Sequence, residues 1–209
     1  MTNKITVNAQ SSIRIAAEKI VYFDPFKITE AKNDADIIFI THEHFDHFSP
    51  EDIAKVSSEN TVFVTPASVV QIVADSGISR DKIVPIDPGD KKTVCGILVE
   101  AVPAYNLNKK FHIKSNDWLG YVVTIGGQRI YVAGDTDATP EAKAVSCNIA
   151  MIPIGGTYTM DFREAADYIN ELKPKIVIPT HYGSVVGNAS DGESFKGLVK
   201  APTEVVFKL

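Results

Sequence analysis

Short hydrophobic runs recur along the whole chain, and most have the length of β-strands rather than of helices. The segment Asp36–Thr41 reads DIIFIT, a nearly continuous apolar run of the kind that is typical of a strand buried on both faces. Other strands are predicted as a pair within Ser12–Phe26, at Thr61–Thr65, as three within Lys82–Val102, as a hairpin over Leu119–Ala133, and at Asn148–Ile154, Lys175–Pro179 and Glu204–Leu209.

Helix signals lie between these strands. Ser49 followed by Pro50 and two acids predicts a helix start, and Asp161-Phe-Arg-Glu164 is a capping-box pattern whose helix should run to about Leu172. Two more helical segments are expected at Pro66–Ser76 and at Phe195–Lys200. Short strands alternate with helical segments along the chain, and the lack of repeats or Pro/Gly/Ser-rich linkers indicates one domain spanning residues 1–209.

Composition narrows the class of protein. With 44% hydrophobic and 22% charged residues among 209, the chain is ordinary for a globular domain and unlike a disordered one. No apolar run suits a membrane span or a signal peptide, and both cysteines, Cys95 and Cys147, have apolar neighbours, which predicts buried free thiols. These features favour a cytoplasmic protein. A net charge of −5 argues against nucleic-acid and membrane partners, while a homo-oligomer stays open.

The segment Thr41–His47 (THEHFDH) is the strongest chemical signal, because it holds three of the five histidines of the chain. Imidazole and carboxylate groups are natural ligands of zinc, iron and manganese. In a tight turn, four such side chains can serve two metal ions. The alternative, a histidine-rich surface turn without metal, is the less favoured interpretation.

Two weaker signals also follow predicted strands. Asp135 comes after a strand and Gly134, and His181 comes after the apolar strand that ends at Pro179. Each pattern alone is common in turns. Since His42, Asp135 and His181 all follow strand ends, where sheet proteins place their sites, we expect them to share one site.

At this point the chain resembles the metallo-β-lactamase superfamily. THEHFDH is similar to its His-x-His-x-Asp-His signature, GDT at 134–136 and THYG at 180–183 to its later Asp and His motifs, and Asp24 in FDPF to its first Asp. The chain is most similar to compact metal-dependent hydrolases, whose relatives include a sugar-phosphate lactonase. The resemblance implies an α+β fold, a four-layer αββα sandwich in which two mixed β-sheets face each other with helices outside.

The resemblance also implies roles for single residues. It places His42 and His44 on a first metal ion, and Asp46, His47 and His181 on a second. Asp135 would bridge the two ions, and Asp24 would orient a ligand from behind. The expected cofactor is zinc, one or two ions per chain, with manganese, iron or nickel as alternatives. Asp46 and Asp135 are the expected catalytic residues, because they would orient the attacking water.

One position departs from the family pattern. Where relatives supply another histidine to the first metal, this chain has Asn106, whose amide is a poorer zinc ligand. The first site is then weak or empty, or prefers a harder ion, or takes His112 from the following loop. For His112 itself, solvent exposure and a contact with substrate are the other two interpretations.

The loop after Asn106 also suggests a substrate. It carries Lys109, Lys110 and Lys114 beside the aromatic Phe111 and Trp118, a composition that would suit the basic rim of a site for a small anionic molecule. A solvated lysine-rich loop is the alternative. Tyr105 and Tyr158 are further candidates for contacts with substrate.

These features predict a metal-dependent hydrolase. A metal-bound hydroxide would cleave a small, anionic ester, lactone or phosphoester, and no Gly-x-Ser-x-Gly, P-loop or Gly-x-Gly-x-x-Gly pattern competes with it. The alternative is a non-catalytic protein in which a degenerate site binds or senses a metal ion or a small anion.

Overall fold

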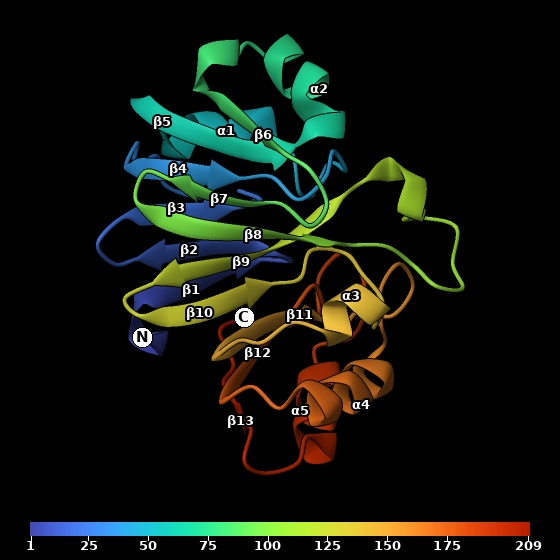
Figure 1. Cartoon of the computed structure of the whole chain (residues 1–209). Helices are drawn as coiled ribbons and strands as arrows, with labels where there is room; N and C mark the ends of the chain where they lie inside the picture. The colour runs from blue at the N-terminus through green and yellow to red at the C-terminus, as the bar shows by residue number, and fades with distance from the viewer.

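The computed structural model describes all residues, 1–209, and contains two β-sheets that lie face to face (Figure 1). The first sheet has the order β1 (Ile5–Ala9), β2 (Ser12–Ala16), β3 (Ile20–Phe23), β4 (Ala35–Phe39), β5 (Ser57–Pro66), β6 (Ile83–Ile86). The second has the order β13 (Glu204–Val205), β12 (Ile176–Thr180), β11 (Ile149–Pro153), β10 (Gln128–Val132), β9 (Leu119–Ile125), β8 (Ile97–Pro103), β7 (Lys91–Val94). Both sheets are mixed: β3 to β6 and β10 to β13 are parallel, and the other pairs are antiparallel.

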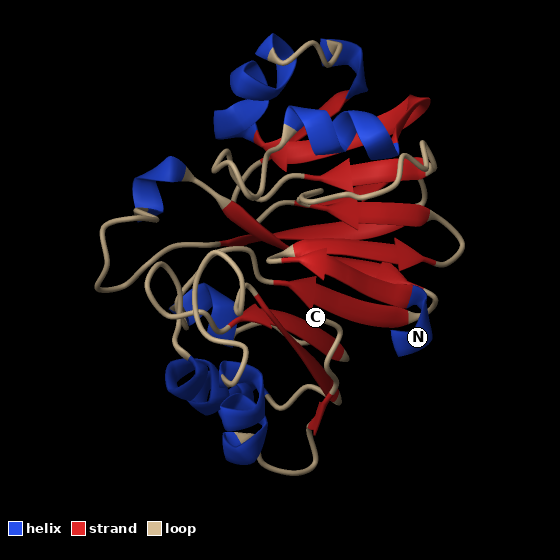
Figure 2. Ribbon diagram, turned by 180° about the vertical axis from the view of Figure 1, so that it is seen from behind, coloured by secondary structure: helices blue, strands red, loops and turns tan.

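Helices cover the outer faces of both sheets. The α-helices are α1 (Pro50–Val56), α2 (Val70–Asp75), α3 (Pro140–Lys143), α4 (Phe162–Leu172) and α5 (Asp191–Leu198), and the 3₁₀ turns are η1 (Thr2–Lys4), η2 (Ala67–Val69), η3 (Arg80–Lys82) and η4 (Lys114–Asn116). Figure 2 shows two groups of helices at opposite ends of the stacked strands. None of the helices has both the length and the apolar character that crossing a bilayer requires.

Three apolar clusters hold these layers together. The largest, with 23 buried residues, takes side chains from both sheets, including Phe23 and Phe39, whose rings stack at 4.7 Å. A second cluster joins the second sheet to α3, α4 and α5, and a third joins the first sheet to α1 and α2. The predicted four-layer sandwich is therefore confirmed.

The strand and helix predictions are largely confirmed, with differences at the two ends of the chain. Strand β1 was not predicted, because at this sheet edge its alternating buried and exposed residues include polar ones. The predicted strand Glu204–Leu209 pairs only over two residues, and α5 begins four residues before the predicted Phe195. Helix α5 was hard to predict because it contains two glycines and its N-cap, Ser190, makes no side-chain capping bond.

The prediction of two buried thiols is wrong for Cys95. Cys95 is exposed, and Cys147 is only partly buried. Cys95 and Gly96 form the tight turn between β7 and β8, and both have positive φ angles, so the turn holds the thiol outside the core despite its apolar neighbours.

The ends of three strands meet at one edge of the sandwich. The segments after β4, β10 and β12 all leave this edge, and the long segment 104–118 follows β8 there and extends beyond the strands (Figure 1, yellow-green). Two hydrogen bonds join the sheets at this edge: Tyr121 donates its hydroxyl to the carbonyl of Ile40 at 2.7 Å, and the Leu119 amide donates to the carbonyl of Thr41 at 3.2 Å. This shared edge positions the site.

Candidate metal centre

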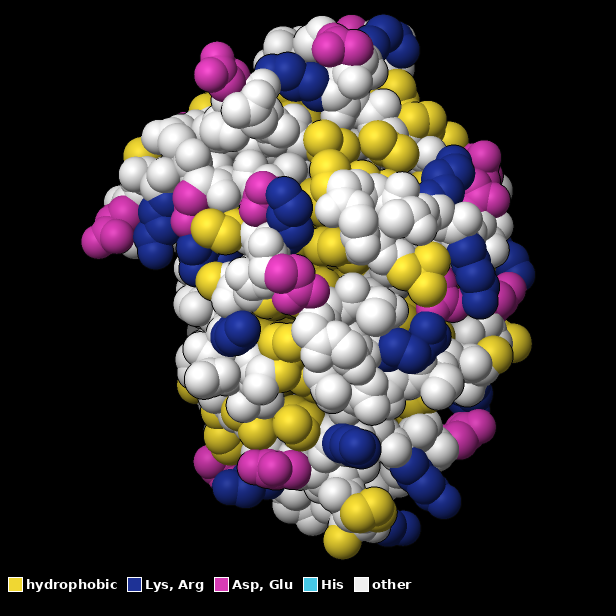
Figure 3. All heavy atoms as spheres, turned by 60° about the vertical axis from the view of Figure 1, so that its left-hand side comes forward, with side chains coloured by type: hydrophobic (Ala, Val, Ile, Leu, Met, Phe, Trp, Pro, Cys, Tyr) yellow, Lys and Arg dark blue, Asp and Glu magenta, His cyan; other side chains and the backbone are white.

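All five histidines of the chain gather at the shared edge with two aspartates. Four of the imidazoles are buried, namely His42, His47, His112 and His181, and His44 is half-buried. On the face drawn in Figure 3 basic and acidic side chains are interspersed and no histidine is visible. The imidazoles are therefore concentrated in one place rather than spread over the surface.

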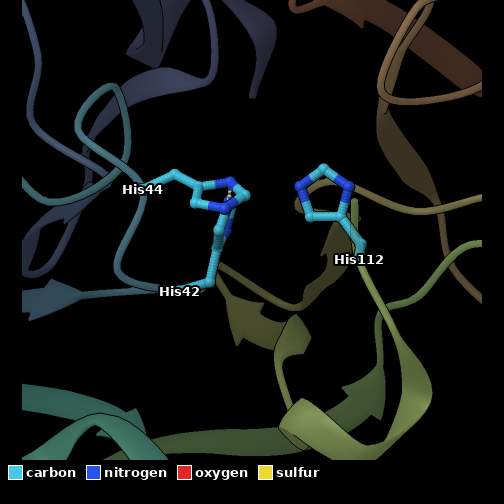
Figure 4. Close-up of side chains that lie close together, drawn as sticks. All are labelled: His42, His44 and His112. Carbon is cyan, nitrogen blue, oxygen red and sulfur yellow. Dashed lines mark hydrogen bonds between the residues drawn. The ribbon is translucent and has the colours of Figure 1, made fainter. Parts of the chain in front are cut away.

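The first group consists of His42, His44 and His112. Their ligand atoms lie within 4.8 Å of one another, and His42 Nε2 is 3.0 Å from His44 Nδ1. Figure 4 shows His42 and His44 on one segment and His112 facing them from the loop after β8. The indole ring of Trp118 packs against all three, with ring centroids 4.8, 4.8 and 5.4 Å away, and so restricts their orientation.

The second group consists of Asp46, His47 and His181, again with ligand atoms within 4.8 Å of one another. His181 Nε2 lies 3.2 Å from Asp46 Oδ2, and His47 Nε2 lies 3.7 Å from the same oxygen. His181 follows β12 with a φ angle of 56°, and its amide donates to the carbonyl of Gln10 at 3.0 Å. The turn between β1 and β2 therefore supports the third member of this group.

Asp135 borders both groups. One carboxylate oxygen, Oδ1, is 3.3 Å from His47 Nε2, and the other, Oδ2, is 3.3 Å from His181 Nε2 and 3.4 Å from His112 Nε2. Gly134 just before it has a φ angle of 64°, and a side chain there would lie 3.0 Å from the carbonyl of Leu119. Glycine therefore allows the chain to turn close to β9 and to place Asp135 between the two groups.

The spacing of these atoms fits metal ions. Two ligand atoms about 2.1 Å from one ion in tetrahedral geometry lie about 3.4 Å apart, and the nitrogen and oxygen pairs described above are separated by 3.0 to 3.7 Å. His47 Nε2, His112 Nε2 and Asp135 Oδ1 are buried and have no hydrogen-bond partner. Buried polar atoms are rarely left unpaired, so these three atoms are suited to bind a cation.

Asp24 lies behind His47 and fixes its ring. Its carboxylate accepts hydrogen bonds from the Thr41 amide at 2.8 Å and from the Thr41 hydroxyl at 2.6 Å, and lies 2.7 Å from His47 Nδ1. A proton on Nδ1 leaves the lone pair of Nε2 directed toward Asp46 and Asp135. This is the placement expected for a residue that orients a ligand.

The structure places His112, and not Asn106, beside His42 and His44. Asn106 Oδ1 accepts from the His112 amide at 3.1 Å and lies 3.3 Å from His112 Nδ1, while Asn106 Nδ2 donates to the Tyr158 carbonyl at 2.9 Å and to Asp137 at 3.2 Å. Asn106 therefore holds the loop that brings His112 inward. The interpretation of His112 as an exposed loop residue is wrong, because its side chain is buried.

Charge and burial set the protonation of these groups. Burial lowers the pKa of His42 well below its ordinary value, and the positive charge of His47 lowers it further. Burial likewise lowers the pKa of His112 to about 4. Both imidazoles are then neutral at pH 7 and keep a lone pair for a metal ion.

For His47 and Asp135, the pKa shifts favour the charged form of each group. Burial alone would lower the pKa of His47, but the carboxylates of Asp135 and Asp24 raise it well above its ordinary value. Burial alone would raise the pKa of Asp135, but the charges of His181 and His47 hold it well below its usual range. A proton on His47 is one way for this buried cluster to balance its carboxylates, and a divalent cation is another.

A cavity of about 340 Å³ opens onto the two groups. It is lined by His44, Phe45, Asp46, Phe111, His112, Asp135, Tyr158, His181 and Val185. Tyr158 lines it as expected, but Tyr105 does not, because its hydroxyl donates to Glu141 at 2.8 Å. That placement argues against the predicted contact between Tyr105 and substrate.

The basic rim predicted from the loop lysines also differs from the structure. Lys109 pairs with Asp137 at 2.9 Å, and Lys114 pairs with Glu141 at 2.7 Å. Both cations are therefore neutralised by nearby carboxylates. The sequence shows the lysines but not these partners, which come from distant segments.

The sequence does not reveal which residues surround the metal-binding side chains. It identifies Trp118 only as a loop aromatic, although this ring packs on three imidazoles, and it indicates no role for Asp137 or Thr41. Thr41 precedes the histidine cluster directly and Asp137 lies two residues after Asp135, so their proximity to the motifs was the available signal.

The chain is similar in sequence to proteins described as metal-dependent hydrolases. The Beta-lactamase superfamily domain profile matches residues 3–182. A UPF0173 metal-dependent hydrolase from Staphylothermus marinus is 33% identical over 210 residues, covering 91% of this chain and 86% of that protein. Another from Thermococcus onnurineus is 30% identical over 216 residues, covering 97% and 95%.

Two solved structures are similar over almost the whole chain. A putative metal-dependent hydrolase from Parabacteroides distasonis has a TM-score of 0.81 and 31% identity, with 98% of this chain and 92% of that chain covered. A putative Zn-dependent hydrolase of the metallo-β-lactamase superfamily from Thermotoga maritima has a TM-score of 0.64 and 20% identity, with 97% of each chain covered, and shows the shared fold.

Gly155→Ala should disturb the second group from outside it. A Cβ at this position would lie 2.1 Å from the His181 carbonyl oxygen, so the loop that carries His181 must move. We expect a loss of about 1–3 kcal/mol in the free energy of unfolding and weaker metal binding, measured by denaturant titration and by metal competition with a chelator. Gly197→Ala, where nothing lies within 4 Å of the added Cβ, is the control. Equal behaviour of the two variants would contradict the proposed support of His181.

Asn106→Ala should weaken metal binding by the first group, because Asn106 positions His112. Removing the side-chain amide takes away the contacts of Asn106 Oδ1 with the His112 amide and ring, and loss of a partner behind a ligand typically lowers metal affinity about 10–100-fold. The measurement is a cobalt(II) titration followed by visible absorption, with thermal unfolding as the check on the fold. Asn108→Ala, an exposed position on the same loop, should leave the affinity unchanged. Unchanged cobalt affinity in folded Asn106→Ala protein would exclude the positioning role.

Proposed function

Because this chain belongs to the UPF0173 metal-dependent hydrolase family of the metallo-β-lactamase superfamily, we propose that it hydrolyses a small ester, lactone or phosphoester at its buried His/Asp centre. The observation that carries the proposal is the spacing of 3.0 to 3.7 Å between ligand atoms, three of which are buried without a partner.

The residues divide between two cation positions. His42, His44 and His112 would hold one ion, and Asp46, His47 and His181 the other, with Asp135 shared between them. A divalent cation bound there would acidify water to a pKa of about 7 and polarise the carbonyl or phosphoryl oxygen of the substrate.

The protein side chains would orient the attacking water and hold the metal-binding rings in place. Asp46 and Asp135 present carboxylate oxygens at the floor of the cavity, where they can hold an attacking water by accepting its hydrogen bonds. Asp24 and Asn106 keep the rings of His47 and His112 in place, so little reorganisation is needed when substrate enters.

The donor set favours zinc over harder ions. Three imidazoles form the first group, and two imidazoles with one carboxylate form the second. Imidazole-rich sites suit zinc, iron and nickel, whereas magnesium and calcium prefer oxygen ligands. Zinc in both positions is therefore our proposal for the native cofactor, with iron and nickel as alternatives. Manganese, which also prefers oxygen ligands, fits this donor set less well.

The alternative function, a degenerate metal or anion sensor, is less well supported. It rested on the absence of a histidine at position 106, but His112 occupies the space beside His42 and His44. With both groups complete and a cavity open to them, catalysis accounts for the arrangement better than sensing does.

Asp135→Asn should abolish turnover while the protein stays folded. The amide is nearly the same size as the carboxylate but lacks the charge that both groups face. We expect hydrolysis of chromogenic carboxylic and phosphate esters, assayed with added zinc, to fall at least about 100-fold, with the circular dichroism spectrum unchanged.

Two companion variants sharpen this test. Asp117→Asn is the matched control at an exposed loop position, and it should keep full activity. His44→Ala, at the half-buried ligand, should lose activity as Asp135→Asn does. Wild-type turnover by folded Asp135→Asn protein in the same zinc assay would contradict the proposal, and tight metal binding with no turnover of any substrate would favour the sensor.

A further inference from the structure

The outer part of the cavity is built from apolar side chains. Phe45, Phe111, Tyr158 and Val185 line it above the His/Asp floor, and no lysine or arginine does. Their side chains are 66%, 43%, 37% and 41% exposed. Single exposed apolar residues are ordinary, but four around one cavity form a surface that gains free energy when an apolar group covers it.

These walls are held in place rather than loose. The rings of Phe111 and Tyr158 meet edge to face with centroids 4.8 Å apart, and Phe45 packs against Phe26 at 5.9 Å. Such aromatic pairs prefer these geometries, so the walls keep their shape without a ligand. A preformed apolar cavity of about 340 Å³ lies in the size range of small-molecule sites.

Apart from the proposed cation positions, the side chains around the cavity do not form an anion site. Phosphate recognition normally uses converging Arg or Lys donors or free backbone amides. Here Lys109 and Lys114 are already paired with Asp137 and Glu141. Lys110 has no such partner, but it is exposed and does not line the cavity.

Lys27 contacts two residues beside the apolar walls, Phe26 and Ser184. Its Nζ donates to the Ser184 hydroxyl at 2.9 Å, next to Val185, and lies 5.5 Å from the centroid of the Phe26 ring. It is exposed and well solvated, so it adds little to the binding of a negative charge.

We propose that the substrate is a carboxylic ester or lactone whose variable part is uncharged and apolar, an alkyl or aryl group that packs against Phe45, Phe111, Tyr158 and Val185. The inference rests on the proposed function and names the substrate class of the same site. In the reaction, the oxygen of water bonds to the acyl carbon and the bond from that carbon to the alcohol oxygen breaks. The alcohol oxygen takes one proton and the acid loses one to solvent. This class replaces the anionic substrate expected from the loop lysines.

The first experiment compares matched chromogenic esters with the metal-loaded protein. 4-Nitrophenyl acetate, butyrate and hexanoate vary only the apolar length, and the 4-nitrophenyl monoester of adipic acid has a carboxylate in place of the terminal methyl group of the hexanoate. We expect kcat/KM to rise roughly tenfold from acetate to butyrate and again to hexanoate, and the adipate monoester to be at least about tenfold poorer than hexanoate. 4-Nitrophenyl phosphate should be the poorest.

Variants then test the walls themselves. Phe111→Ala and Phe45→Ala should each reduce the preference for hexanoate over acetate by about tenfold or more. Leu98→Ala, which removes a large exposed apolar side chain from β8 outside the cavity, should keep the preference. A preference for the adipate monoester or the phosphate, or a flat chain-length series in the natural protein, would overturn the proposed substrate class.

A binding measurement separates this inference from the proposed function. 2-Octanone resembles hexyl acetate but has no bond to hydrolyse, and its binding is followed by NMR of the aromatic ring signals. Saturable shifts of the Phe111 and Tyr158 rings, with weaker binding reported by Tyr158 in Phe111→Ala, support the apolar site even if no ester is cleaved. Turnover of phosphate esters without 2-octanone binding would keep the hydrolase and overturn the apolar class.

Discussion

The rest of the structure depends on the burial of several ionisable side chains at one place. Asp24, His47 and Asp135 are almost completely removed from solvent, and Asp46 is nearly so. Buried carboxylates are costly unless opposite charges and hydrogen bonds surround them. Each feature around the site serves that requirement: Thr41 and His47 satisfy Asp24, while His181 and the other imidazoles face Asp46 and Asp135.

The two-sheet architecture brings these charged side chains together at one edge. Parallel strands end at a common edge, so residues after β4, β10 and β12 meet without long connections. The apolar layer between the sheets keeps the edge rigid, and Tyr121 joins both sheets just behind the first histidine. The loop after β8 then closes the side left open by the strand ends and brings both His112 and Trp118.

The sequence predicted what depends on local pattern and on strand ends. The strands and helices followed from the apolar runs and cap patterns, and the four-layer α+β fold followed from the resemblance to the metallo-β-lactamase superfamily. The grouping of His42, Asp135 and His181 followed from their places after strands. The position of His112 did not follow, because five residues of loop separate it from Asn106, and the bonds of Asn106 and Tyr158 show how the loop folds inward. The sequence also could not show that the lysines of the loop are neutralised, because the partners of Lys109 and Lys114 lie about 30 residues away in the chain.

If His112 completes the first of two cation positions, the number of bound metal ions depends on this residue. The protein would be purified without chelators or a metal-affinity tag, and its metals counted by plasma mass spectrometry, beside His112→Ala prepared in the same way. We expect about two equivalents per chain in the natural protein and about one in His112→Ala. One equivalent in both proteins would contradict this expectation, because the first group would then hold no ion of its own.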